Sequence, residues 1–205
     1  MKLNAIEKTL MNNPVRGLLQ RRYEAPLLKR LGGRTEGLRV LEIGCGRGVG
    51  TEIIFKHFGA REVHAFDIDP DMVDQARRRL FGYPAESLKL YVGDAAAIEE
   101  EVESFDAVFD FGIIHHVPEW PRAVAEVARV LRPGGRFFFE EVTTHALNRW
   151  SYRTFLEHPT ENRFSAEGFV AELERQGIAV GGNYVERFFG DFVFGVGRTG
   201  GSKKL

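Results

Sequence analysis

The chain has 205 residues, 43% of them hydrophobic, which is enough to bury the core of a single domain. Its formal net charge of −1 lacks the basic excess of proteins that bind polyanions, so we expect no nucleic-acid partner. The single cysteine, Cys45, excludes an internal disulfide and a multi-cysteine metal site, and it favours a cytoplasmic protein without bound metal. No apolar run approaches membrane-spanning length.

Residues 1–33 predict an N-terminal helical cap, because apolar residues recur there at helical spacing. Pro14 and Pro26 are expected to divide this segment, and Gly32 with Gly33 to end it. We interpret its basic residues as the solvated face of a packing helix; contact with an anionic substrate or a peripheral membrane contact is the alternative. These residues are Arg16, Arg21, Arg22, Lys29 and Arg30.

The next stretch, residues 38–51, is an apolar run with one acid that breaks into closely spaced glycines. Glycine occupies every second position at Gly44, Gly46, Gly48 and Gly50. The pattern predicts a buried strand, a loop on which a ligand can lie against bare backbone, and a helix from about Thr51.

Helices and strands alternate over the rest of the chain. Helices are expected at about 51–58, 70–80, 118–130 and 165–176, and strands at 63–66, 88–92, 107–111, 136–142, 180–189 and 192–198. Alternation implies parallel pairing through right-handed crossovers, and Gly190-Asp191 indicates a hairpin. The predicted fold class is α/β: a doubly wound, seven-stranded, mostly parallel sheet with a C-terminal antiparallel hairpin.

Ligands of such sheets bind beyond the carboxyl ends of the strands, where Gly44, Asp67, Asp94 and Asp110 fall. The dinucleotide fingerprint Gly-x-Gly-x-x-Gly fails, because its third glycine would stand at Val49. The loop also lacks the Lys-Ser or Lys-Thr pair of a phosphate-binding loop. These features favour a ligand without a pyrophosphate, and an NAD(P)-dependent oxidoreductase is the alternative.

Five stretches, in order and at the right spacing, resemble the motifs of class I S-adenosylmethionine-dependent methyltransferases of the broad small-molecule group. They are residues 40–48, 64–72, 92–95, 105–116 and 131–136. The resemblance covers residues 38 to about 142. It implies a Rossmann-like fold, S-adenosylmethionine as cofactor, and methyl transfer to an oxygen, nitrogen or carbon atom of a small-molecule or lipid-headgroup acceptor. A non-catalytic member that binds the cofactor and acts as a partner protein is a further alternative.

The resemblance also assigns roles at the methionine and ribose parts of the cofactor. Gly44 and Gly46 would let the backbone approach the methionine part, and Glu42 would hold its ammonium group. Asp67 would accept hydrogen bonds from both ribose hydroxyls, because an ionised carboxylate offers two acceptor oxygens. Ile68 would lie on an adenine face.

Further roles concern the adenine amino group and the chemistry. Asp94 would accept from the exocyclic amino group, with a backbone amide from Ala95, although Asp94 could be only a turn residue. Asp110 is placed among the cofactor-binding residues. His115 and His116 are candidate general bases, with helix packing as the alternative for either one. The neighbouring carboxylates Glu140 and Glu141 are weaker candidates for steering a cationic acceptor.

The remaining segments bear on the acceptor. We expect the cofactor-binding domain at 34–199, an acceptor-side insertion at 143–164 and a disordered tail at 200–205. The fourth strand lacks the Asn/Asp-Pro-Pro-Tyr/Phe motif with which many methyltransferases bind planar amino groups. The single cysteine, Cys45, lies in the cofactor loop, so the cysteine nucleophile of cytosine ring-carbon methyltransferases is missing. These features indicate a small-molecule or lipid-headgroup acceptor, in a pocket built from residues 1–30 and 143–164. The sequence sets no oligomeric state.

Overall fold

The computed structural model of the chain describes residues 14–147 and 163–201. Residues 1–13, most of the predicted insertion and residues 202–205 of the predicted tail therefore lie outside the described residues. In the described ranges, no helix combines the length and apolar character needed to cross a membrane.

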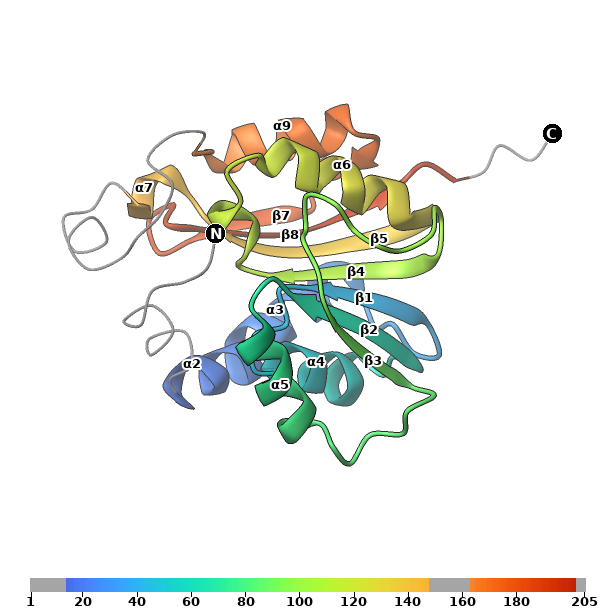
Figure 1. The fold of residues 1–205 in the computed structure, drawn as a ribbon. Coiled ribbons are helices and arrows are strands. Elements are labelled where there is room, and N and C mark those ends of the chain that lie inside the picture. Colours follow the sequence, from blue (N-terminus) through green and yellow to red (C-terminus); the bar gives the residue numbers. More distant parts are fainter. Residues whose placement is uncertain (1–13, 148–162, 202–205) are drawn as a thin grey trace.

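A mixed sheet of eight strands forms the centre of the fold, in the order β3-β2-β1-β4-β5-β8-β6 with β7 beside β8 (Figure 1). The five parallel strands are β1 (Arg39–Ile43), β2 (Glu62–Asp67), β3 (Leu88–Val92), β4 (Phe105–Phe111) and β5 (Leu131–Val142). The antiparallel ones are β6 (Ile178–Ala179), β7 (Tyr184–Arg187) and β8 (Phe192–Thr199). The predicted fold class is confirmed.

Two boundaries differ from the prediction. The expected strand 180–189 is wrong, because Gly181 and Gly182 interrupt it and leave β6 and β7 as separate partners of β8, which gives eight strands instead of seven. The expected strand 136–142 begins earlier, at Leu131, because Leu131 already pairs with Phe105 before the register shifts to Arg136. The hairpin of β7 and β8 is confirmed as antiparallel.

Helices cover both faces of the sheet (Figure 1). One face carries α3 (Ala25–Gly32), α4 (Val49–Ile53) with its π-helical continuation η2 (Ile54–Phe58), and α5 (Pro70–Arg79). The other face carries α6 (Trp120–Val130) and α9 (Ala166–Arg175). Short helical segments at the carboxyl ends of β4 and β5 are η3 (Ile114–His116) and α7 (Thr144–Leu147). Because helices cover both faces and successive strand residues point to opposite faces, alternate phenylalanines of β5 pack into opposite cores. Phe138 packs into one core, and Phe137 and Phe139 pack into the other.

The N-terminal segment forms one continuous helical arm, residues 14–32, made of α2 (Pro14–Leu19), the π-helical η1 (Gln20–Glu24) and α3. The prediction that Pro26 divides the segment is wrong. Pro26 lies in the first turn of α3, directly after the π-helical turn, in which the Ala25 amide donates to the Gln20 carbonyl. The wider turn accommodates a residue that lacks an amide hydrogen. Gly33, with φ of 76°, ends the arm as predicted.

Phe109 is central to the core beneath the arm, because it is fully buried and its ring centroid lies 4.3 Å from Phe138 and 4.7 Å from Phe58. We expect Phe109→Ala to lower the free energy of unfolding by about 3–5 kcal/mol, from lost burial and the cavity left behind. Urea unfolding measures this, with Phe189→Ala as control because Phe189 is 93% exposed. Equal losses in the two variants would contradict the described packing.

Candidate functional site

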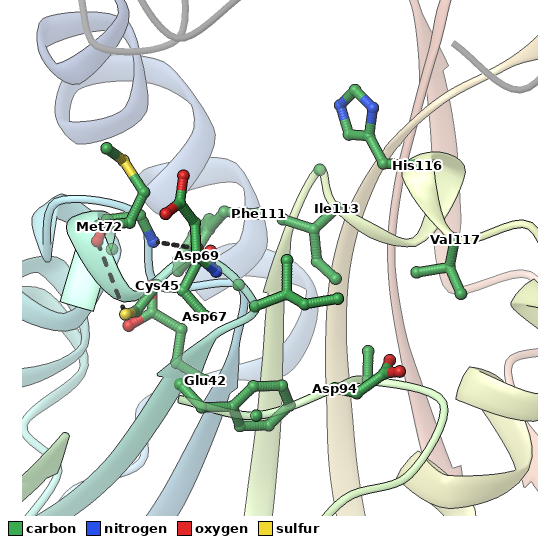
Figure 2. A pocket seen from close by; sticks show the side chains of 18 of the residues that line it. Glu42, Cys45, Asp67, Asp69, Met72, Asp94, Phe111, Ile113, His116 and Val117 are labelled. Atoms are coloured by element: carbon green, nitrogen blue, oxygen red, sulfur yellow. Dashed lines mark hydrogen bonds between the residues drawn. The ribbon is translucent and has the colours of Figure 1, made fainter. Parts of the chain in front are cut away.

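A cavity of about 460 Å³ lies beyond the carboxyl ends of β1, β2 and β4 (Figure 2). This volume is within the range of small-molecule sites. The wall includes the glycine loop, residues 66–69 after β2, residues 93–96 after β3, the start of the turn after β4, and residues 116–119. Gly17 and Gln20 of the helical arm complete it.

The glycine loop presents bare backbone to this cavity. Gly44 has φ of 70°, and a Cβ there would lie 2.4 Å from the Ile113 side chain. Gly46 has φ of 49°, and a Cβ there would meet no atom of the described residues within 4 Å. Both conformations favour glycine, and any side chain at Gly46 would project into open space. The loop is thus shaped for a ligand that lies directly on its backbone.

Asp67 ties the loop to the end of β2. Its Oδ2 accepts the Gly46 amide at 2.9 Å, and its Oδ1 accepts the Asp69 amide at 2.9 Å. A carboxylate oxygen has two lone pairs, so each still has acceptor capacity for a ligand at the cavity it lines. The structure therefore gives Asp67 a supporting role in the loop in addition to the predicted binding role.

The residues predicted to surround adenine also lie on the cavity wall. Ile68 is 41% exposed and lines the cavity, so its side chain offers an apolar surface on which a ring can stack. Asp94 and Ala95 follow β3, and Asp94 Oδ1 accepts the Ala96 amide at 2.9 Å. Asp94 is thus a turn residue through one oxygen, as the alternative interpretation held, while its second oxygen stays compatible with the predicted contact.

Glu42 is a buried acid on the cavity wall, and the Thr51 hydroxyl donates a hydrogen bond to it. Burial raises the pKa of Glu42 to about 8, and the nearby Asp67 and Asp110 carboxyls add to the increase. A cationic group in the cavity would favour the charged form of Glu42. The residue is therefore suited to hold an ammonium group. Burial also raises the pKa of the Cys45 thiol well above its usual value, so this residue is a poor nucleophile.

The structure separates the two candidate histidines. His116 lines the cavity, across from Met72 in Figure 2. His115 is buried with its Nδ1 2.6 Å from Glu141 Oε2, and it does not line the cavity. The two ring centroids lie 4.1 Å apart. Of the two, only His116 is placed to meet a ligand directly.

Asp110 and Glu141 support the turn that carries these histidines. Asp110 Oδ1 accepts the Ile113 amide at 2.9 Å, and Glu141 Oε1 accepts the Ile114 amide at 2.6 Å. Both carboxyls are fully buried behind the cavity wall instead of lining it. Burial and the adjacent Glu141 carboxyl raise the pKa of Asp110 well above its usual value, and burial raises that of Glu141 to about 7. Burial therefore favours the protonated form at both positions.

The other predicted acid, Glu140, faces the helical arm. Its Oε1 accepts a hydrogen bond from Arg16 Nη2 at 2.8 Å, and Arg16 also pairs with Glu24. Arg21 pairs with Glu52 of α4 at 2.7 Å. Two of the five basic residues of the arm thus face protein partners instead of solvent, so the predicted solvated face does not hold for Arg16 and Arg21.

Several wall residues were given no role from the sequence, although Met72, Phe111 and Ile113 stand within the motif stretches 64–72 and 105–116. The full set is Gly17, Gln20, Met72, Phe111, Ile113 and Val117. The one available signal concerns Gln20, which stands four residues from both Arg16 and Glu24 and so shares their helix face.

Comparisons with known proteins agree with this geometry. The sequence profile of a family described as "Methyltransferase domain" matches residues 40–135. A fatty-acid O-methyltransferase of Mycolicibacterium smegmatis is 36% identical over 106 residues, which are 52% of this chain and 38% of that protein. Phosphoethanolamine N-methyltransferase 2 of Caenorhabditis elegans is 32% identical over 110 residues, 54% of this chain and 25% of that protein. The chain thus spans well under half the length of either relative.

The fold has close counterparts among solved structures. A crystal structure of a SAM-dependent methyltransferase from Aquifex aeolicus superposes with a TM-score of 0.73 at 24% identity, over 96% of this chain and 98% of that one. The profile match contains the glycine loop, Asp67, Asp94 and His116, all on the wall of one cavity. Residues 40–135 of the chain thus match the methyltransferase domain family, and the fold is that of solved S-adenosylmethionine-dependent methyltransferases.

Proposed function

We propose that the protein transfers a methyl group from S-adenosylmethionine to a small-molecule or lipid-headgroup acceptor. One observation carries the proposal: the glycine loop, Glu42 and Asp67 share a single cavity with His116. The first three suit the cofactor and His116 suits the acceptor. Both reactants could therefore meet in this space.

The side chains present fit the cofactor. Gly46 leaves room above its backbone, Glu42 is a buried acid for an ammonium group, and Asp67 offers acceptor oxygens for hydroxyls. Ile68 and Asp94 offer an apolar face and an acceptor for a base. When bound, S-adenosylmethionine supplies an electrophilic methyl group on a sulfonium.

The contribution of the protein is alignment, water exclusion and proton removal. Apolar wall residues Phe111, Ile113 and Val117 limit the water near the reacting atoms. His116 would take a proton from an acceptor hydroxyl or amine, because its imidazole lines the cavity and histidine is the most common general base. Asp110 and Glu141 would hold the His116 turn in place through the Ile113 and Ile114 amides.

The proposed acceptor class rests on the apolar side chains of the cavity wall and on a second group of apolar side chains outside it. Exposed apolar side chains at the arm and the β7–β8 hairpin are Val15, Leu18, Leu19, Phe188 and Phe189. Tyr23 of the arm packs on Phe188 with ring centroids 6.0 Å apart, so the two exposed groups adjoin. They support an acceptor with an apolar body, in agreement with the fatty-acid substrate in the name of one relative. Peripheral membrane contact by the arm and a cytoplasmic location stay predictions.

Isothermal titration calorimetry with S-adenosylhomocysteine tests the cofactor. We expect the wild type to bind and Asp67→Asn to bind roughly ten- to a hundredfold more weakly, because hydrogen bonds to a charged acceptor are replaced by weaker ones. A thermal shift with NAD(P)H and none with S-adenosylhomocysteine would overturn the proposal in favour of an oxidoreductase.

Glu42 predicts a pH dependence. Only its ionised form attracts an ammonium group, and its pKa is about 8, so affinity for S-adenosylhomocysteine should rise up to tenfold per unit between pH 6 and pH 8. Glu42→Gln should remove this rise. In the free protein the raised pKa means that the folded state binds the proton more tightly, so stability should fall as pH rises from about 4.5 to about 8. A flat affinity profile in the wild type would contradict the assigned role.

His116 predicts a catalytic effect. With an acceptor identified from a panel of hydroxyl and amine compounds, His116→Ala should lower kcat by roughly 10²–10⁴-fold while S-adenosylhomocysteine affinity changes little. His57→Ala is the control, because His57 lies on η2 away from the cavity wall. Tight cofactor binding without turnover over the whole panel would favour the non-catalytic alternative.

A further inference from the structure

Gln20 is a polar side chain for which neither the family motifs nor the proposed chemistry accounts. It is only 9% exposed, lies in the π-helical turn η1 and lines the cavity. Within the described residues, its side-chain amide makes no hydrogen bond. Because Gln20 lines the cavity, its amide is open to a ligand there, and π-helical turns are often found at functional sites. The pattern indicates that the partner of Gln20 is a ligand.

The helical arm is fixed across the cavity on both sides of Gln20. Arg16, one turn before it, donates to Glu140 of β5 at 2.8 Å, and the adjacent Arg21 pairs with Glu52 of α4 at 2.7 Å. A Cβ built on Gly17 would lie 3.6 Å from Val49, the first residue of α4. Gln20 therefore lies over the region between the α4 N-terminus and β5.

This position identifies which part of the cofactor Gln20 would meet. The adenine-side residues Ile68 and Asp94 follow β2 and β3, which lie on the opposite side of β1 from β4 and β5. The arm side instead contains Glu42 and the glycine loop, where the methionine part is expected. That part ends in a carboxylate and an ammonium group, and an amide can donate to the first and accept from the second.

We propose that Gln20 recognises the amino-acid end of the cofactor, with the helical arm as a clamp that closes this end of the cavity. The inference rests on the proposed function, because it takes S-adenosylmethionine as the ligand. It extends the cofactor site to a residue outside every motif of the family. Glu42 and Gln20 then contact the same zwitterion from the strand side and from the arm side.

A comparison of two ligands distinguishes recognition of the amino-acid end by Gln20 from a general loss of cofactor binding. S-adenosylhomocysteine carries the amino-acid end, whereas 5′-methylthioadenosine has the same adenosine and thioether without it. By calorimetry, Gln20→Leu should lower the affinity for S-adenosylhomocysteine roughly ten- to a hundredfold and leave the affinity for 5′-methylthioadenosine within about twofold of the wild type. Thermal unfolding of the free variant should occur close to the wild-type temperature, because the substitution breaks no hydrogen bond within the described residues.

Two further variants complete the experiment. Gln20→Glu keeps the shape and polarity of the side chain but repels a carboxylate, so it should reproduce the selective loss even where Gln20→Leu folds poorly. Gln75→Leu on α5, outside the cavity wall, should change neither affinity. Equal losses for both ligands, or unchanged affinity for S-adenosylhomocysteine with only acceptor KM raised, would overturn the assignment. Failure of the wild type to bind S-adenosylhomocysteine would instead contradict the proposed function, and the assignment with it.

Discussion

The parallel pairing of β1 with β2 and β4 is the constraint on which the cavity depends. The register sets Ile43 beside Phe66 and beside Asp110, so the three strands end at nearly the same level. The Cys45 amide then donates to the Phe66 carbonyl at 2.8 Å, and the Gly46 amide donates to Asp67. The glycine loop is thus held by the neighbouring strand before any ligand arrives. Backbone groups fixed in this way lose little freedom on binding.

Strand alternation gives the acids at these strand ends different tasks. Glu42 and Glu140 point to the face covered by α4 and the arm, where one lines the cavity and the other pairs with Arg16. Asp110 and Glu141 point to the opposite face and hold the turn of η3. Acids that look alike in the sequence therefore divide into an acid on the cavity wall, an anchor for the arm and supports for a turn. The role of each acid is decided by the face of the sheet toward which its side chain points.

The sequence predicted the parts of the site that follow directly from strands. The glycine loop, Asp67 and Asp94 each come within two residues of a strand end, so the predicted topology was enough to bring them together. It could not distinguish His115 from His116, because the separation depends on Glu141, which is 26 residues further along the chain. Gln20 was missed for a similar reason. Its place over the cavity depends on Arg16 reaching Glu140, 124 residues away, and no local pattern encodes that contact.

The arm carries Arg16, which pairs with Glu140, and Gln20, whose side-chain amide makes no hydrogen bond within the described residues. Together they suggest why the arm is fixed in one position. Glu140 is buried, so its ion pair with Arg16 forms at a desolvation cost. Such a pair favours one position of the arm over others, which apolar contacts alone specify less sharply. A fixed position is of little use to a helix that only covers a core. It is useful to a side chain such as Gln20, which lines the cavity and whose hydrogen bonds to a ligand depend on distance and angle.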